Sequence, residues 1–435
     1  MLHFYSTQGQ CPPATLEEAV MNGLAPDGGL YMPERIPRLP DSFIKQLPAL
    51  SFHELSYEIA KTLLGESLTE NTLLEIIKKS SHFDAPLKKI SPGIHSLELF
   101  HGPTLSFKDF GAQFMAQLMG YFMQKKDNPL HILVATSGDT GSAIAQAFLD
   151  VPSIKVWILY PQGKVSWTQE LQLTTMGKNI TALEVQGTFD DCQRLVKTAF
   201  SDQDLRSKRS LTSANSINIA RLIPQSFYYF RGFAQLEDPY LPTVFSVPSG
   251  NFGNLAAGII AQRMGLPIHH FIAATNINDS VPSYLKSGIF TPKPSKHTIS
   301  NAMDVGNPSN FARLLDLYGN DWTKIRHALF GVSYTDIETE NAIHQVFTHN
   351  HYILDPHGAV AYLGLQSYLK SKAENINGIF LETAHPAKFA ADVEKCIHQK
   401  IDIPPNLQET LLKTKYATLI GTDYSELKSL LEGCE

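Results

Sequence analysis

The chain has 435 residues, which is more than one hydrophobic core usually organises, so two or three domains are expected. Hydrophobic residues make up 43% of the sequence and charged residues 18%, a balance that is typical of a folded globular protein and excludes a disordered chain. The formal net charge is −6, so the chain lacks the basic character of nucleic-acid-binding proteins and no nucleic-acid partner is expected.

The cysteines and the N-terminus bear on the cellular compartment. Cys11, Cys192, Cys396 and Cys434 are far apart and match no metal-binding spacing, which favours free thiols in a reducing compartment. Residues 1–7 contain no basic segment followed by an apolar core, so no signal peptide is expected. No apolar run approaches the roughly 18 residues that span a membrane, so no membrane partner is expected. Together these features predict a cytoplasmic protein.

The first part of the chain differs in character from the rest. Residues 1–90 are expected to be mainly helical, and Ser51-Phe-His-Glu54 has the pattern of a capping box that opens a helix ending near Leu64. From about residue 95, strand-like runs alternate with helical patterns, which indicates a parallel α/β sheet. A long helix with few helix-breaking residues is predicted over residues 217–236.

A domain boundary is predicted at residues 238–242, Asp-Pro-Tyr-Leu-Pro, after which the α/β pattern resumes. The sequence therefore predicts an α/β fold in three parts. They are a mainly helical N-terminal domain at residues 1–94, a smaller α/β domain at 95–240 and a larger α/β domain at 241–435. A cleft between the two α/β domains is the natural place for a small-molecule site.

The most informative segment is residues 101–112, His-Gly-Pro-Thr-Leu-Ser-Phe-Lys-Asp-Phe-Gly-Ala, which places Lys108 between Phe107 and Phe110. Loss of water around a lysine amine lowers its pKa and makes it a better nucleophile toward a carbonyl. Taken alone, Lys108 also fits a lysine at a helix start whose amine reaches solvent. The aromatic neighbours argue against this, because an apolar surface is unfavourable for an unpaired ammonium.

Two glycine-containing loops follow predicted strands and open predicted helices. In residues 135–142, free N–H groups at the helix start would hold an anion, and Ser137 and Thr140 add hydroxyl groups. In residues 249–254, two glycines allow the backbone to approach a phosphate closely. Each loop alone also fits a turn without a ligand. Combined with a nucleophilic lysine, the loops suggest a covalently held phosphorylated aldehyde, which usually means pyridoxal phosphate (PLP).

Two other segments bring polar side chains to predicted helix starts. Arg221, in residues 215–221, is suited to bidentate binding of a carboxylate or phosphate, although an ordinary surface arginine remains an alternative. Thr383 fits either a strand-end hydroxyl that faces the cleft or a helix N-cap. His349, His351 and His357 lack the helical spacing with a carboxylate that metal sites use, so no metal is expected.

These segments, taken in order, resemble the threonine synthase family, whose members are PLP enzymes of fold type II, the tryptophan synthase β-like fold. The combination is specific because it covers nearly the whole chain, and it is similar to the class with an extended helical N-terminal region. The matching segments are residues 23–33, 101–111, 135–141, 215–221, 248–254, 273–279, 300–304 and 383–389.

The resemblance implies a role for particular residues. Lys108 is the implied catalytic Schiff-base lysine in the smaller α/β domain, and Thr383 would hydrogen-bond the pyridine nitrogen. The other implied cofactor-binding residues are Phe107, Asp139 and the phosphate loop of the larger domain, Gly250, Asn251, Phe252, Gly253 and Asn254. The implied substrate-binding residues are Thr136, Ser137, Thr140, Lys164 and, for a substrate phosphate, Asn215, Ser216 and Arg221.

Two positions depart from the pattern of many relatives. Asp139 stands where many fold type II enzymes have asparagine, which should alter the charge beside the cofactor. Gln8 stands where many relatives have arginine, which leaves the role of the N-terminal segment open.

The activity implied by the resemblance is conversion of O-phospho-L-homoserine and water to L-threonine and phosphate by γ-elimination and β-addition, the last step of threonine biosynthesis. A related fold type II lyase or dehydratase acting on phosphohomoserine, threonine or serine is an alternative, as is a catalytically silent PLP-binding protein. A monomer or a homodimer is expected.

Overall fold

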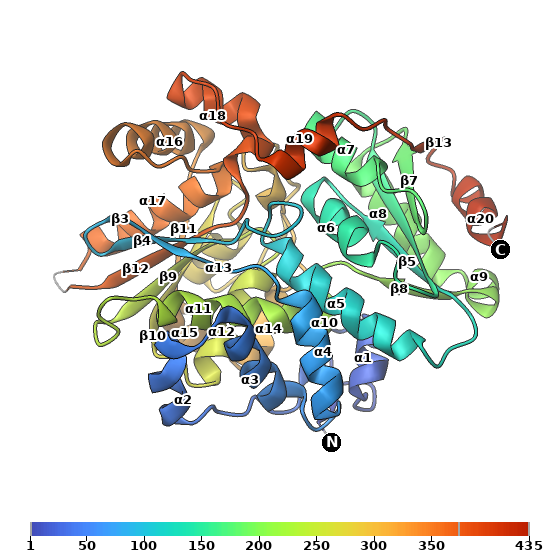
Figure 1. Cartoon of the computed structure of the whole chain (residues 1–435), viewed down its shortest axis with the longest axis horizontal. Helices are drawn as coiled ribbons and strands as arrows, with labels where there is room; N and C mark the ends of the chain where they lie inside the picture. Colours follow the sequence, from blue (N-terminus) through green and yellow to red (C-terminus); the bar gives the residue numbers. More distant parts are fainter. Residues whose placement is uncertain (1, 373–374, 434–435) are drawn as a thin grey trace.

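The computed structural model describes residues 2–372 and 375–433. Figure 1 shows two open sheets side by side, a six-stranded sheet on the left and a five-stranded sheet on the right. The helices of the N-terminal region, in blue, gather along the lower side of the molecule (Figure 1). Within the described residues, none of the helices combines the length and the apolar character needed to cross a membrane.

The N-terminal region consists mainly of helices, as predicted. The capping box at Ser51 and Glu54 is confirmed: the Ser51 hydroxyl accepts the Glu54 N–H at 3.3 Å, and the Glu54 carboxylate accepts the Ser51 N–H at 2.8 Å. A short antiparallel pair of strands, which was not predicted from the sequence, joins residues 4–6 to residues 31–33. The elements are β1 (Phe4–Ser6), α1 (Leu16–Asn22), β2 (Tyr31–Pro33), α2 (Asp41–Gln46), η1 (Leu47–Ala49), α3 (Phe52–Leu64) and α4 (Glu70–Ser80).

The five-stranded sheet is parallel throughout, with strand order β13-β7-β6-β5-β8. Its strands β5 and β6 are almost entirely buried, as is usual for parallel sheets, which helices cover. The strands are β5 (Leu130–Ala135), β6 (Ile154–Pro161), β7 (Ile180–Val185), β8 (Ser210–Ser213) and β13 (Thr418–Ile420). The helices around it are α5 (Lys108–Met123), α6 (Asp139–Phe148), α7 (Trp167–Thr174), α8 (Phe189–Ser201), α9 (Gln203–Lys208) and α20 (Tyr424–Gly433).

The six-stranded sheet has the order β11-β10-β9-β12-β4-β3 and is parallel except for the edge strand β3. Its strands are β3 (Leu87–Ser91), β4 (Ile94–Glu98), β9 (Thr243–Pro248), β10 (Ile268–Thr275), β11 (Leu329–Ser333) and β12 (Asn377–Glu382). The helices between β9 and β13 are α12 (Gly253–Arg263), α13 (Ser280–Ser287), η3 (Asn301–Met303), α14 (Phe311–Leu317), α15 (Trp322–Ala328), α16 (Asp336–Asn350), α17 (Pro356–Lys370), η4 (Pro386–Phe389), α18 (Ala390–Ile397) and α19 (Pro405–Leu411).

Strand pairing crosses the predicted domain boundaries. The strand β4, which spans the boundary after residue 94, pairs with β12 in the six-stranded sheet. The strand β13, near the C-terminus, pairs with β7 in the five-stranded sheet. The division into residues 1–94, 95–240 and 241–435 therefore stays a prediction about folding units, and it does not coincide with the division between the sheets.

The prediction of a single long helix over residues 217–236 was wrong. The segment instead contains α10 (Ile219–Leu222), the 3-10 turn η2 (Ile223–Ser226) and α11 (Phe227–Ala234). Pro224 has no backbone N–H, and its ring disfavours a regular helical turn before it, so the α-helix gives way to a 3-10 turn at this position. The break lies in buried surroundings, and Tyr229 beyond it donates a hydrogen bond to the Asn254 side chain at 2.7 Å.

Candidate active site

The predicted site residues follow the carboxyl ends of strands in both sheets. Residues 136–138 follow β5, residues 249–252 follow β9, and Thr383 follows β12. Both glycine loops thus have the predicted strand–loop–helix context, before α6 and α12 respectively. In parallel α/β sheets, ligands bind outside the carboxyl ends of the strands. The Phe107 N–H donates to the Thr383 carbonyl at 2.9 Å, which holds the start of α5 against this edge.

Lys108 is the first residue of α5, and its side chain is 12% exposed. Its Nζ lies 4.7 Å from the centre of the Phe107 ring and 3.5 Å from Asp139 Oδ2. Burial lowers the pKa of the Lys108 amine; Asp139 opposes this shift, and the charges of Lys388 and Arg221 reinforce it. The net shift is downward, which makes the neutral, nucleophilic form of the amine more accessible than in a free lysine.

Asp139 begins α6 and is buried, although it is held as a carboxylate. Its Oδ1 accepts a hydrogen bond from Gln169 Nε2 at 2.8 Å and pairs with Lys388 Nζ at 2.8 Å. Burial raises the pKa of Asp139, but the cations of Lys388 and Lys108 and the Gln169 bond outweigh it and leave the pKa lowered. Gln169 and Lys388 were not predicted from the sequence, where the one signal for Lys388 is that it lies inside the matching segment 383–389.

The loop at residues 249–254 has the geometry of an anion cradle. At Gly250, an added Cβ would lie 2.8 Å from Met303 Cα, so only glycine fits there without displacing the backbone. Phe252 adopts a left-handed conformation, φ 63°, and directs the chain into α12. The first N–H groups of α12 have no acceptor within the helix. The Asn254 Nδ2 is buried and has no hydrogen-bond partner within the described residues.

A second cluster of donors lies at residues 215–221. Arg221 is buried; its Nη1 donates to the Ala214 carbonyl at 2.8 Å, and its Nε has no partner among the described residues. Burial lowers the pKa of Arg221 to about 10, with Asp109 opposing the shift. The Asn215 Oδ1 is likewise buried and unpartnered in the described structure. Buried groups without partners are costly, so this cluster fits a site that a polar ligand completes.

Arg313 connects these two clusters and was also missed from the sequence. It is fully buried on α14, and its Nη2 donates to the carbonyls of Ile217 at 2.7 Å and Tyr31 at 3.1 Å. Its Nη1 donates to Asn310 Oδ1 at 2.5 Å, and burial lowers the pKa of Arg313 to about 9. Asn310 in turn donates to Ser216 Oγ at 3.3 Å and to the Asn251 carbonyl at 3.2 Å. Asn310 therefore ties the loop at 215–217 to the loop at 250–254, and Arg313 holds Asn310 in place.

The other predicted substrate residues differ in how they are placed. The Thr136 hydroxyl closes its own turn, accepting the N–H groups of Gly138 at 3.0 Å and Gly141 at 2.9 Å. Ser137 is exposed and Thr140 is half-buried at the start of α6. Lys164 is exposed in the turn after β6, so of the predicted residues it is the one least fixed by its surroundings.

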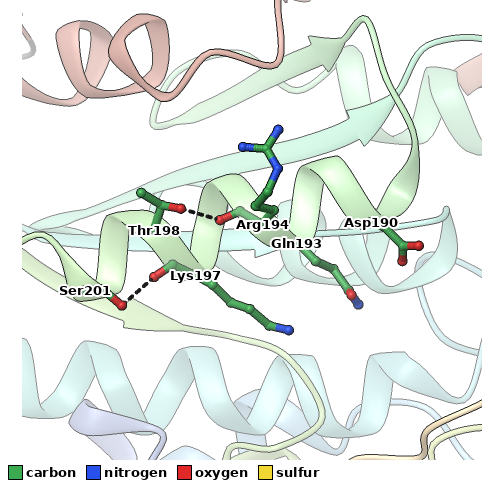
Figure 2. A pocket seen from close by; sticks show the side chains of 6 residues that line it. All are labelled: Asp190, Gln193, Arg194, Lys197, Thr198 and Ser201. Carbon is green, nitrogen blue, oxygen red and sulfur yellow. Dashed lines mark hydrogen bonds between the residues drawn. The ribbon is translucent and has the colours of Figure 1, made fainter. Parts of the chain in front are cut away.

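Surface features elsewhere do not compete with this site. A hollow of about 500 Å³ lies on α8, lined by Asp190, Gln193, Arg194, Lys197, Thr198 and Ser201. Figure 2 shows that all six side chains project from this one helix, and the hydroxyls of Thr198 and Ser201 bond to the carbonyls of Arg194 and Lys197. In residues 2–372 and 375–433, no group of three or more His, Cys, Asp or Glu side chains is arranged to hold a metal ion. His357 instead bonds Asp355, the N-cap of α17.

Comparison with known proteins places the chain in a family. A family model described as "Threonine synthase N terminus" matches residues 3–81, one described as "Pyridoxal-phosphate dependent enzyme" matches 91–378, and one described as "Threonine synthase, C-terminal" matches 358–431. The chain is 43% identical over 434 residues to a threonine synthase of Haemophilus influenzae, with 99% of each chain covered.

Solved structures agree with this assignment. Threonine synthase from Escherichia coli superposes with a TM-score of 0.92 at 39% identity, and PLP-bound threonine synthase from Brucella melitensis with a TM-score of 0.92 at 32% identity. Each comparison covers 99% of both chains. The predicted fold type and cofactor class are confirmed, and the chain belongs to the threonine synthase family of pyridoxal-phosphate-dependent enzymes.

Proposed function

We propose that the protein converts O-phospho-L-homoserine and water into L-threonine and phosphate, the last step of threonine biosynthesis, with PLP as its cofactor. The observation that carries the proposal is that the helix of Lys108 packs on Arg221, a buried arginine whose Nε lacks a partner in the described structure: an added Cβ at Gly111 of α5 would lie 3.2 Å from that Nε. The lysine suits an aldehyde cofactor, and the arginine suits a second anion. A phosphorylated amino-acid substrate provides that anion.

Three features of the site support its fit to PLP. The Lys108 amine is buried and has a lowered pKa, as a carbonyl nucleophile requires. The loop 250–254 offers N–H groups at the start of α12, where Gly250 leaves no room for a side chain. The unpartnered Asn254 Nδ2 adds a donor to the same loop. When bound, PLP supplies an electron sink that stabilises a carbanion.

Lys108 is the residue that we propose for covalent attachment and for proton transfer. The free amine would remove a proton at Cα and then one at Cβ, which drives loss of phosphate from Cγ. It would then return one proton to Cγ and one to Cα, while water adds its hydroxyl at Cβ and its remaining proton leaves with the phosphate. The lowered pKa of Lys108 suits these transfers, because it leaves a larger share of the amine uncharged and able to accept a proton.

The remaining residues bind and orient. Asn215, Ser216 and Arg221 hold the substrate phosphate, and Ser137 and Thr140 offer hydroxyls to the substrate carboxylate or the cofactor. Thr383 would offer the ring nitrogen of the cofactor a neutral hydroxyl, which would not keep that nitrogen protonated. The lesser substrate-binding candidates, by their placement, are Thr136 and Lys164. Phe107, Asp139 and residues 250–254 remain the proposed cofactor-binding set.

The nearest alternative is a lyase of the same family that releases 2-oxobutyrate from phosphohomoserine, or a dehydratase acting on threonine or serine. The cluster at residues 215–221 favours a phosphorylated substrate over the dehydratase. A cytoplasmic location, the lack of a nucleic-acid partner and a monomeric or homodimeric state remain predictions from the sequence.

A product assay tests the proposal. Purified protein with PLP and O-phospho-L-homoserine should release phosphate and threonine in a 1:1 ratio. Phosphate accompanied by 2-oxobutyrate would support the lyase. If protein that holds PLP releases no phosphate, O-phospho-L-homoserine is refuted as the substrate. Serine and threonine, supplied separately, should give no ammonia, which excludes the dehydratase.

A further inference from the structure

A second lysine lies beside the proposed catalytic lysine and has no role in the proposal above. Lys388 belongs to η4, which follows β12, and its side chain is fully buried. Its Nζ lies 2.8 Å from Asp139 Oδ1 and donates to the Thr104 carbonyl at 2.8 Å. A lysine is rarely buried in this way unless it is paired, so its ionic partner is central to its purpose.

One carboxylate is shared between two lysines, and the sharing is unequal. Asp139 Oδ1 faces Lys388 Nζ at 2.8 Å and Gln169 Nε2 at 2.8 Å, whereas Oδ2 faces Lys108 Nζ at 3.5 Å. Oδ1 lies at the shorter distance and has two hydrogen-bond partners, so the contact of Asp139 with Lys388 is stronger than its contact with Lys108. Asp139 therefore pairs mainly with Lys388 and is only a secondary partner of Lys108.

Charged groups face Lys108 from several packed elements. Asp139 reaches it from α6, Lys388 from η4 and Arg221 from α10. On α5 itself, Asp109 is turned toward Thr104, whose N–H and hydroxyl it accepts at 2.9 Å and 2.7 Å. The Asp139–Lys388 pair is neutral as a unit, so a net positive charge from Arg221 remains near Lys108.

We propose that Lys388 is a positioning residue that neutralises Asp139 and thereby keeps the Lys108 amine free to react with the aldehyde of the cofactor. This inference rests on the proposed function, because it requires PLP at Lys108. The uncharged amine attacks the carbonyl carbon, a C=N bond forms, and one water molecule leaves with the carbonyl oxygen and the two amine protons. Without Lys388, the charge of Asp139 would act on Lys108 alone and hold it as an ammonium.

The test is a pH titration of the visible absorbance of the bound cofactor, without substrate, in wild-type protein and in Lys388→Gln. Glutamine retains a donor for Thr104 or Asp139 and removes the charge. Because an unpaired carboxylate favours the protonated form of a neighbouring nitrogen, the titration midpoint should rise by about one pH unit or more. Recombination of PLP with the apoprotein at pH 7 should be about tenfold slower, since less of the Lys108 amine is neutral.

A double-mutant cycle shows whether Lys388 acts through Asp139. Asp139→Asn alone should lower the midpoint, and the double variant Asp139→Asn, Lys388→Gln should lie near the wild-type value. Lys395→Gln is a matched control, because Lys395 is an exposed lysine on the adjoining α18 that pairs with Glu340 at 3.1 Å. The control should titrate as the wild type does.

Lys388→Arg covers the case in which the glutamine variant does not fold. It keeps the charge, so a folded Lys388→Arg protein should keep its midpoint within about 0.3 units. An unchanged midpoint in folded Lys388→Gln, or a shift of a full unit in Lys388→Arg, would overturn the proposal. The titration needs no substrate, so wild-type protein that binds PLP at Lys108 but releases no phosphate would refute the proposed reaction and leave this test intact.

Discussion

The two groups of buried cations in this protein are treated in opposite ways. Lys108 and Lys388 share the carboxylate of Asp139. Arg221 and Arg313 are equally buried, but their guanidinium groups donate to carbonyl oxygens and an amide, with no carboxylate in hydrogen-bond contact among the described residues. The contrast separates two tasks. The paired charges of Asp139 and Lys388 leave the Lys108 amine reactive, whereas an arginine without a carboxylate partner attracts an anion.

The largest effect is expected at Lys108, in the group of lysines. Lys108→Ala should lower kcat by about 10³-fold or more, because both the covalent attachment and the proton carrier are lost. Borohydride treatment of the wild type should fix the cofactor to the peptide that contains Lys108, as measured by mass spectrometry. Lys126→Ala, at an exposed lysine that pairs with Glu17 at 2.9 Å just after α5, should behave as the wild type. Threonine formation by Lys108→Ala at the wild-type rate would remove Lys108 from the mechanism.

In the group of arginines, a substitution at Arg221 should change the KM for the substrate. Arg221→Ala should raise the KM for O-phospho-L-homoserine by about 10- to 100-fold, the loss expected for hydrogen bonds to a charged group. The affinity for PLP should stay nearly constant, because the cofactor phosphate has its own loop. Steady-state kinetics and a PLP titration measure the two effects. Arg231→Ala is the matched control, since Arg231 lies on α11 and pairs with Asp84 at 2.7 Å. A loss of PLP affinity with an unchanged KM would assign Arg221 to the cofactor.

Arg313 should matter more for stability than for chemistry. Arg313→Met leaves the carbonyls of Tyr31 and Ile217 and the Asn310 amide oxygen without a donor, at about 1–3 kcal/mol for each unsatisfied group. A loss of about 3–4 kcal/mol in the free energy of unfolding is expected, visible as a lower thermal unfolding midpoint. The KM should rise as well, because Ser216 and Asn310 lose their shared anchor. Arg326→Met, at an exposed position on α15, should leave both quantities unchanged.

The sequence was sufficient to predict the elements that local patterns specify. The alternation of apolar runs and helical patterns predicted the parallel sheets, and Ser51 with Glu54 predicted the start of α3. The prediction of one long helix over 217–236 was wrong because it followed the helical pattern on both sides of Pro224 and gave the proline itself too little weight. Buried surroundings then stabilise the broken form, which no local pattern reveals.

The site was predictable as a set of motifs but not as a set of contacts. Lys388 and Thr104 are 284 positions apart in the sequence and meet only because the strands β4 and β12 pair. Arg313 lies in a segment with no glycine loop or strand-end hydroxyl to mark it. Both residues act through partners distant in sequence, so their importance follows from the fold. The same reasoning explains why the domain boundaries, which strand pairing crosses, resist prediction from composition.

The smallest expected effect concerns Asp109, the carboxylate whose charge raises the pKa of Arg221. Burial raises the pKa of Asp109 from 3.8 to about 6, with the Thr104 hydrogen bonds and Lys388 opposing the shift. The folded state therefore binds more protons than the unfolded chain between pH 3.8 and about 6, so this group's stabilising contribution is complete at lower pH and lost as the pH rises through that window. The shift of about two units corresponds to at most about 3 kcal/mol.

Asp109→Asn should lack this dependence. The difference in unfolding free energy between the wild type and the variant should therefore change by up to about 3 kcal/mol between pH 4 and pH 7, with the wild type losing stability relative to the variant as the pH rises. Urea unfolding at several pH values measures it, and Asp41→Asn, at a position 81% exposed, is the control. Parallel stability curves for the wild type and Asp109→Asn would mean that burial does not raise the pKa of Asp109, so that its carboxylate opposes the charge of Arg221 at lower pH as well.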